Sequence, residues 1–330
     1  MEARLLERDP RVAATHPLRR LEPAALAATR AAALACQRWA GRGRGKAADR
    51  AATEAMRASL SRAPGIGTVV IGEGAKDEAP MLFDGERLGA GNGPDFDIAV
   101  DPLECTKLCA KGLPGALATI ALAEAGAMAT IGAAFYMEKL VGPPETRGAL
   151  DIGEPPEANL ERAAVALGKA KEQLNVVVLD KPRHRELIER IHLAGARVIS
   201  PPDGDVGGAL AALLPEAGAD LLMGVGGTPE GVMTACAARA LGGFMQGRLA
   251  PQRDDERQAV AAAGLSTERT YELDDLVGGD SLFVATGVTG GALVRRPWHK
   301  GGHPYTDSIV IAAGSVRRVV EAQLDTKEWA

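Results

Sequence analysis

Aromatic residues are scarce in this chain, since only 3% of its 330 residues are Phe, Trp or Tyr. A surface that stacks nucleic-acid bases needs exposed rings beside basic residues, so the composition does not favour one. The formal net charge of -5 likewise gives no general attraction to nucleic acid or acidic membranes. With 46% hydrophobic residues and 40 glycines, the sequence is typical of a globular protein with tight turns and close packing.

Cysteines are also few: the chain has four, with no CxxC spacing. The charged N-terminal residues 1–10 contain no apolar segment of a signal peptide, so we expect reduced thiols and a cytoplasmic protein. Cys105 and Cys109 stand four residues apart on an expected helix. They are either a redox pair or two buried reduced thiols.

No apolar run is typical of a membrane span. The longest one, residues 113–136, is rich in Gly and Ala and carries Glu124 near its middle. It predicts two buried strands instead, over 116–123 and 128–135.

Periodicity and turn residues predict an α/β protein. In the first half we expect helices over 21–40, 47–62 and 105–112, and strands over 68–71 and 97–100. Past residue 148, strands alternate with helices, which predicts a mostly parallel sheet with strands 176–179, 198–200 and 220–223 and helices 182–194, after 205, and 229–241. From 281 onward the strands 282–285, 293–295, 309–312 and 317–320 are expected to be antiparallel. Proline pairs near 148–157 suggest an N-terminal lobe, 1–150, and a C-terminal lobe, 151–330.

Acidic residues follow several of these strands directly. Ligands of open α/β sheets bind at the carboxyl ends of strands, so these carboxylates can converge on one point. Clustered carboxylates repel one another, and a hard cation that prefers oxygen ligands, Mg²⁺ or Mn²⁺, removes that cost. The alternative is that the acids are separate loop and cap residues. The residues concerned are Glu73, Asp101, Glu104, Asp203, Asp205 and Glu230.

Two further segments suggest phosphate chemistry. Thr106 comes just after the acids, where a hydroxyl can orient an attacking water, although many threonines in this position are plain helix caps. Arg183 lies in a basic first helical turn, Lys181-Pro-Arg-His-Arg185, which the helix dipole disfavours unless an anion binds there. The Gly-rich turn 224–230 can hold phosphate or sugar oxygens, whereas segment 41–46 lacks the spacing of a nucleotide-binding P-loop.

The motifs occur in a recognisable order: Val70-Ile-Gly-Glu-Gly74, Asp97-Ile-Ala-Val-Asp-Pro102, Tyr136-Met-Glu-Lys139, Lys181-Pro-Arg-His184, Asp203-Gly-Asp-Val206 and Pro229-Glu-Gly-Val232. From about residue 26 to 320 the chain resembles the class II fructose-1,6-bisphosphatases, the bacterial type within the lithium-sensitive phosphatases. The resemblance implies a layered α/β/α/β/α sandwich, a homo-oligomer and a Mn²⁺ or Mg²⁺ cofactor. It also implies hydrolysis of the 1-phosphate of fructose-1,6-bisphosphate, in gluconeogenesis or the Calvin cycle, and of sedoheptulose-1,7-bisphosphate as in cyanobacterial relatives.

The resemblance also implies a role for each matching residue. The metal ligands would be Asp49, Glu73, Asp101, Glu104 and Glu230, and the catalytic residues Thr106, Asp77 and Glu104. The substrate would be bound by Glu104, Cys105, Thr106, Tyr136, Lys181, Pro182, Arg183, Asp203, Gly204, Asp205 and Gly227.

Three positions depart from the family pattern. Cys105 replaces a glycine, Ala75 replaces an acid, and Arg44-Gly45 replaces an Asp-Lys pair. These departures leave two alternatives open: a phosphatase for another sugar or polyol phosphate, and a weakly active paralogue that binds sugar phosphates.

Overall fold

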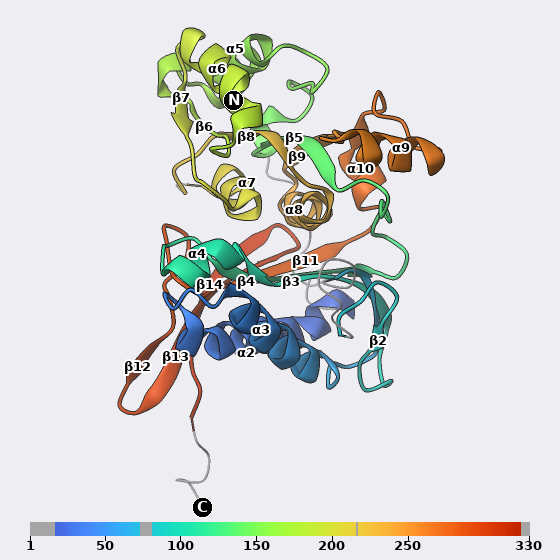
Figure 1. Cartoon of the computed structure of the whole chain (residues 1–330), viewed down its shortest axis with the longest axis vertical. Coiled ribbons are helices and arrows are strands. Elements are labelled where there is room, and N and C mark those ends of the chain that lie inside the picture. The colour runs from blue at the N-terminus through green and yellow to red at the C-terminus, as the bar shows by residue number, and fades with distance from the viewer. Residues whose placement is uncertain (1–16, 73–80, 216, 325–330) are drawn as a thin grey trace, which may run out of the picture.

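A computed structural model describes residues 17–72, 81–215 and 217–324 of the chain. Its helices and sheets alternate in five layers (Figure 1). From one side to the other, the layers are α5 (Pro156–Leu167) with α6 (Arg185–Leu193), a six-stranded sheet, α7 (Asp205–Leu213) with α8 (Thr228–Leu241), an eight-stranded sheet, and α2 (Glu22–Cys36) with α3 (Gly45–Leu60). This arrangement confirms the predicted α/β/α/β/α sandwich.

The eight-stranded sheet takes its strands from both ends of the chain. Its main path runs β12-β13-β11-β4-β3-β1-β2, and β14 pairs with β13 at the edge. Only β1 and β3 pair in parallel, so the predicted antiparallel pairing of the C-terminal strands is confirmed. The strands are β1 (Ile66–Ile71), β2 (Arg87–Leu88), β3 (Asp95–Glu104), β4 (Leu117–Glu124), β11 (Ser281–Gly287), β12 (Trp298–Lys300), β13 (His303–Ala312) and β14 (Ser315–Ala322).

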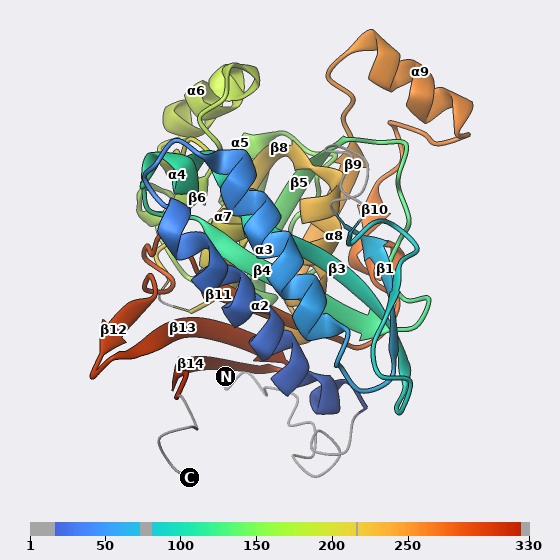
Figure 2. The same ribbon diagram turned by 60° about the horizontal axis from the view of Figure 1, so that its bottom comes forward.

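Helices cover both faces of this sheet, which explains the continuous apolar runs in its central strands. Every residue of β11 is buried, as expected for a strand with packing on both sides. Figure 2 shows α2 and α3 lying across the outer face. The buried side of α2 includes Ala25, Ala28 and Ala32, whose small side chains let the helix approach the strands closely.

The six-stranded sheet is mixed, so the prediction of a mostly parallel sheet is wrong. Its order is β10-β9-β5-β8-β6-β7; β6 pairs in parallel with β7 and β8, while the other neighbours are antiparallel. The antiparallel strands lie outside the βαβ units that carried the sequence signal. The strands are β5 (Tyr136–Gly142), β6 (Asn175–Val177), β7 (Arg197–Ile199), β8 (Leu221–Gly227), β9 (Phe244–Leu249) and β10 (Tyr271–Glu272).

Each of the two sheets contains strands from both sides of the predicted boundary at residue 150. β5 precedes the boundary but lies in the six-stranded sheet, while β11 to β14 return to the eight-stranded one. The division into lobes 1–150 and 151–330 therefore stays a prediction. The remaining elements are α4 (Thr106–Lys111), α9 (Asp254–Ala262), α10 (Leu273–Leu276) and the 3-10 turns Pro17–Leu21, Gln37–Trp39, Pro144–Thr146, Lys171–Gln173 and Pro182–His184. Within the described ranges, no helix is long and apolar enough to cross a bilayer.

Two predicted strands are wrong. Residues 128–135 form a crossing segment between the sheets, with Met128 in an isolated bridge and Ala134 in the core. Met128 and Ala134 are buried, whereas Phe135 is 44% exposed, so this apolar run corresponds neither to a strand nor to uniform burial. Residues 293–295 are not a strand either, because the Arg295 amide donates to the Asp307 carboxylate instead of to a neighbouring strand.

Cys105 is the only residue between the end of β3 and the start of α4. Its backbone is left-handed, with φ 65° and ψ 49°. This conformation costs a residue with a side chain about 1–2 kcal/mol, and glycine avoids the cost. Among the described residues, Leu82 and Ala313 are the other non-glycines with positive φ. The direct turn from strand to helix places Glu104 and Thr106 on either side of Cys105.

We expect glycine to be better tolerated than alanine at position 105. Both substitutions remove the buried thiol, but only alanine keeps the strain of a left-handed residue with a Cβ. The free energy of unfolding of Cys105→Gly, measured by urea denaturation, should therefore exceed that of Cys105→Ala by about 1 kcal/mol. Position 313, also left-handed, should show the same order of glycine over alanine. In α8, Ala238→Gly should instead lose about 1 kcal/mol. A more stable Cys105→Ala would contradict the strain argument.

Candidate metal and phosphate site

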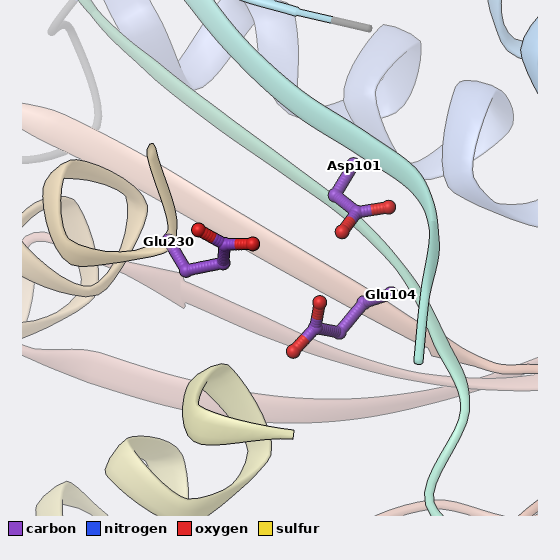
Figure 3. A group of neighbouring side chains, drawn as sticks. All are labelled: Asp101, Glu104 and Glu230. Carbon is purple, nitrogen blue, oxygen red and sulfur yellow. The ribbon is translucent and has the colours of Figure 1, made fainter. Parts of the chain in front are cut away.

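Three carboxylates from two layers meet at the centre of the molecule. Asp101 and Glu104 come from β3 and Glu230 from the first turn of α8, each offering an oxygen within 4.8 Å of the others. Figure 3 shows the three side chains pointing toward one another. Residues three apart on a regular strand face opposite sides, but the pairing register shifts between Asp101 and Glu104. This irregularity lets both carboxylates face α8.

A cavity of about 280 Å³ opens beside these carboxylates. Asp49 of α3 and Thr106 of α4 line it together with Asp101 and Glu230, so four predicted site residues share one space. Apolar side chains line it as well, among them Ile131 and Phe135 of the crossing segment. Glu73 and Asp77, predicted as a metal ligand and a catalytic residue, lie outside the described residues.

The carboxylates disturb one another's protonation. Burial, followed by the negative charges of Asp205 and Glu230, raises the pKa of Glu104 to about 8. A carboxyl group with this pKa carries a proton at neutral pH unless a cation lies beside it. Because all the donors are carboxylate oxygens, the cluster suits a hard divalent cation rather than zinc or copper.

The loop Asp203-Gly-Asp205 lies directly against the turn at Cys105. Gly204 has φ +99°, and a Cβ on it would stand only 3.0 Å from Cys105 Sγ. The thiol therefore fills the space between the two loops and faces Gly204. This contact brings Asp203 and Asp205 next to Glu104, which explains their effect on its pKa.

A cationic group lies at the edge of the six-stranded sheet. The Arg183 guanidinium donates to the Val225 carbonyl at 3.2 and 2.8 Å and lies 5.2 Å from the centre of the Tyr136 ring. Tyr136 pairs with Gly227 at the end of β8, and a Cβ on Gly227 would overlap the Glu230 carboxylate. The ring thus links the guanidinium to the strand end that precedes Glu230.

The two residues before Arg183 extend the cationic group, and residues 181–183 together form the cationic segment. Lys181 Nζ lies 3.6 Å from the Asp203 carboxylate, and the exposed Pro182 begins the 3-10 turn Pro182–His184. The structure therefore brings the described members of the predicted set together, whereas their catalytic and binding roles remain predictions.

Two residues next to the site escaped the sequence analysis as site residues. Lys139 in β5 is only 2% exposed and forms an ion pair with Asp205. Its only signal in the sequence is its place at the end of the motif Tyr136-Met-Glu-Lys139, just before the apolar residues of the same strand. Asp84 lines the cavity, and its carboxylate accepts a hydrogen bond from the Gly72 amide at 3.0 Å. It therefore holds the backbone just after β1, directly before Glu73 in the sequence. It lies in a glycine-rich loop, where an acid is unremarkable.

The redox hypothesis for Cys105 and Cys109 gains no support. Cys109 shares a hydrogen bond with Cys36 of α2, and the Cys105 thiol faces Gly204. All four cysteines are free and buried, in agreement with the prediction of reduced thiols.

We expect Lys139→Met to be strongly destabilising. It leaves the Asp205 carboxylate buried without its counter-charge, which typically costs about 3–5 kcal/mol of unfolding free energy. Adding Asp205→Asn should restore much of this loss, because the uncompensated charge is gone. Arg50→Met, which removes an exposed pair with Glu54, should cost less than about 1 kcal/mol. Urea denaturation of the three variants tests this order, and a mild effect of Lys139→Met would contradict it.

Comparisons with known proteins agree with this geometry. Residues 19–323 match the family model described as "Bacterial fructose-1,6-bisphosphatase, glpX-encoded". A "Fructose-1,6-bisphosphatase class 2" of Haemophilus influenzae is 45% identical over 303 residues, covering 87% of this chain and 90% of the relative. A "D-fructose 1,6-bisphosphatase class 2/sedoheptulose 1,7-bisphosphatase" of a Synechococcus species is 41% identical over 310 residues, covering 86% and 89%. The chain therefore belongs to the family of bacterial class 2 fructose-1,6-bisphosphatases, which are phosphoric monoester hydrolases.

Proposed function

We propose that this protein hydrolyses the 1-phosphate of fructose-1,6-bisphosphate to give fructose 6-phosphate, with Mn²⁺ or Mg²⁺ as cofactor. The observation that carries the proposal is the carboxylate cluster of Asp101, Glu104 and Glu230 beside the cavity that Thr106 lines. In a member of this family, the cluster has the donors for the metal, and the cavity has room for a phosphate group.

The acidic residues would hold the metal, with Asp101, Glu104 and Glu230 joined by Asp49 across the cavity and by Glu73. When bound, the metal neutralises charge on the phosphate and makes water a better nucleophile. Thr106 would orient that water. Its hydroxyl donates to the Leu103 carbonyl at 3.0 Å, so the lone pairs of its oxygen are left to accept a hydrogen bond from that water. Asp77 would assist proton transfer.

The cationic segment would bind the second phosphate. Lys181 supplies a mobile ammonium group, and Arg183 has a planar guanidinium already fixed by Val225 and Tyr136. Positive charge here and carboxylates at the metal cluster together match a sugar that carries a phosphate at each end.

The sugar between the two phosphates would contact the loop before α7 and the end of β8. Asp203 and Asp205 offer carboxylate oxygens, and Gly204 and Gly227 let the backbone come close. Cys105, turned toward Gly204, would form part of this wall. The Synechococcus relative is named for both a hexulose and a heptulose bisphosphate, and we propose that this chain also accepts sedoheptulose-1,7-bisphosphate.

We further propose a homo-oligomer that acts in the cytoplasm. The free, buried thiols support a reducing compartment. An oligomer is supported by β14, whose outer edge carries Val316 and Val320, each more than 40% exposed (41% and 45%).

The proposal is tested by phosphate release from fructose-1,6-bisphosphate. Purified protein with Mn²⁺ should release phosphate, chelation should stop the reaction, and Asp101→Ala should lower kcat at least about 10³-fold because a metal ligand is lost. Glu161→Gln, which changes an exposed acid of α5 that pairs with Lys171, should leave kcat unchanged. No release with Mn²⁺ or Mg²⁺ would refute the proposed activity.

A further inference from the structure

His184 is a buried histidine next to the cationic segment. Its side chain lies between two backbone groups: the Val225 amide donates to Nε2 at 2.8 Å, and Nδ1 lies 2.8 Å from the Leu179 carbonyl. A backbone amide can only donate, so Nε2 is the acceptor and carries no proton. The proton is therefore on Nδ1, which donates to Leu179. The surroundings fix one neutral form of the ring.

One of the two backbone groups follows a strand of the six-stranded sheet, and the other lies within the neighbouring strand. Leu179 follows β6, and Val225 lies in β8. The ring thus ties the chain after β6 to the neighbouring strand, and it is only 3% exposed. Because both of its nitrogens are used, a rotation of the ring would leave buried polar groups unsatisfied.

Between these two attachments the chain carries Lys181 and Arg183. Both backbone groups of Val225 are hydrogen-bonded to this turn: its amide donates to His184 Nε2, and its carbonyl accepts from the Arg183 guanidinium. The His184 amide in turn donates to the Lys181 carbonyl at 2.9 Å, which closes the turn. Any movement of the ring therefore changes the carbonyl against which Arg183 is aligned.

The neighbouring strand is shaped to accept the ring. Gly224 has φ +120°, and a Cβ on it would lie 2.9 Å from His184 Nε2, closer than real Cβ atoms come. Burial lowers the pKa of His184, and the charges of Arg183 and Lys181 add to this effect, so the ring stays neutral. Neutrality is what the amide of Val225 requires.

We infer that His184 is a positioning residue that aligns Arg183, and with it the cationic segment, for the phosphate that is not hydrolysed. The inference rests on the proposed function, because it assumes that Arg183 binds the second phosphate. It assigns His184 no contact with the reacting phosphate and no part in proton transfer. Loss of the ring should weaken the binding of a bisphosphate and leave the chemistry at the carboxylate cluster intact.

The test compares two substrates that differ only in the second phosphate. For His184→Phe, which keeps the ring shape without its nitrogens, KM for fructose-1,6-bisphosphate should rise about tenfold or more with kcat nearly unchanged. KM for fructose 1-phosphate should not change. His184→Asn, which retains a donor for Leu179, serves as a second variant should the bulkier apolar ring unfold the protein.

A double-mutant cycle with Arg183→Ala identifies the route of the effect. If His184 acts through Arg183, the double variant should bind fructose-1,6-bisphosphate no worse than Arg183→Ala alone. His192→Phe, a change at an exposed histidine of the following helix α6, is the matched control and should leave both KM values as they are.

The outcomes separate the two proposals. A wild-type protein that does not hydrolyse fructose-1,6-bisphosphate refutes the proposed function. A wild-type protein that does, combined with an unchanged KM in folded His184 variants, overturns the role of His184. An equal rise of KM for both substrates, or additive rises of KM in the double variant, would show a general structural role and would also overturn the role of His184.

Discussion

The mutual repulsion of Asp101, Glu104 and Glu230 is the constraint on which the centre of this molecule depends. The fold supplies these carboxylates from different layers and holds their oxygens within 4.8 Å, in a place where Glu104 is 6% exposed. Asp205 adds a further negative charge, and the buried ammonium group of Lys139 compensates it. Burial, together with the negative charges of Asp205 and Glu230, raises the pKa of Glu104 to about 8. The cluster is stable as an ionised group only beside a cation.

The same packing brings acids and bases to the site from different elements. The middle helix layer carries acids at its N-termini, Asp205 at the start of α7 and Glu230 in the first turn of α8. Lys181 and Arg183 stand at the edge of the adjoining sheet, where His184 and Val225 hold their turn. In the proposed function, a substrate with two phosphates would meet the carboxylate cluster at one end and the Arg183 guanidinium at the other.

Local sequence signals predicted much of this arrangement. The acids of β3, the Gly-rich turn before α8 and the basic turn after β6 were evident because strand ends and helix starts have short-range patterns. The five-layer fold followed from the family resemblance. By contrast, the strand over 128–135 was wrong, since an apolar run says nothing about hydrogen-bond partners, and Phe135 of this run is 44% exposed.

The remaining features depend on contacts between distant segments. Lys139 belongs to a recognisable motif, but its partner Asp205 lies 66 positions away. His184 is separated from Val225 by 41 positions. The register shift in β3 and the left-handed backbone of Cys105 arise from the fit of β3 to β4 and of α4 to its neighbours. Such pairings have no local signature, so a single sequence could not predict them.

The most direct test of the central claim is calorimetric titration of the metal-free protein with Mn²⁺ in buffers of different ionisation enthalpy. The bound metal needs Glu104 ionised, whereas the raised pKa keeps it protonated below about pH 8 without metal. We therefore expect about one proton to be released per Mn²⁺ at pH 7, and the affinity to rise as the pH is raised toward 8. Glu104→Gln should abolish the release, and Glu161→Gln should not. Tight Mn²⁺ binding without proton release, unaffected by Glu104→Gln, would contradict the account.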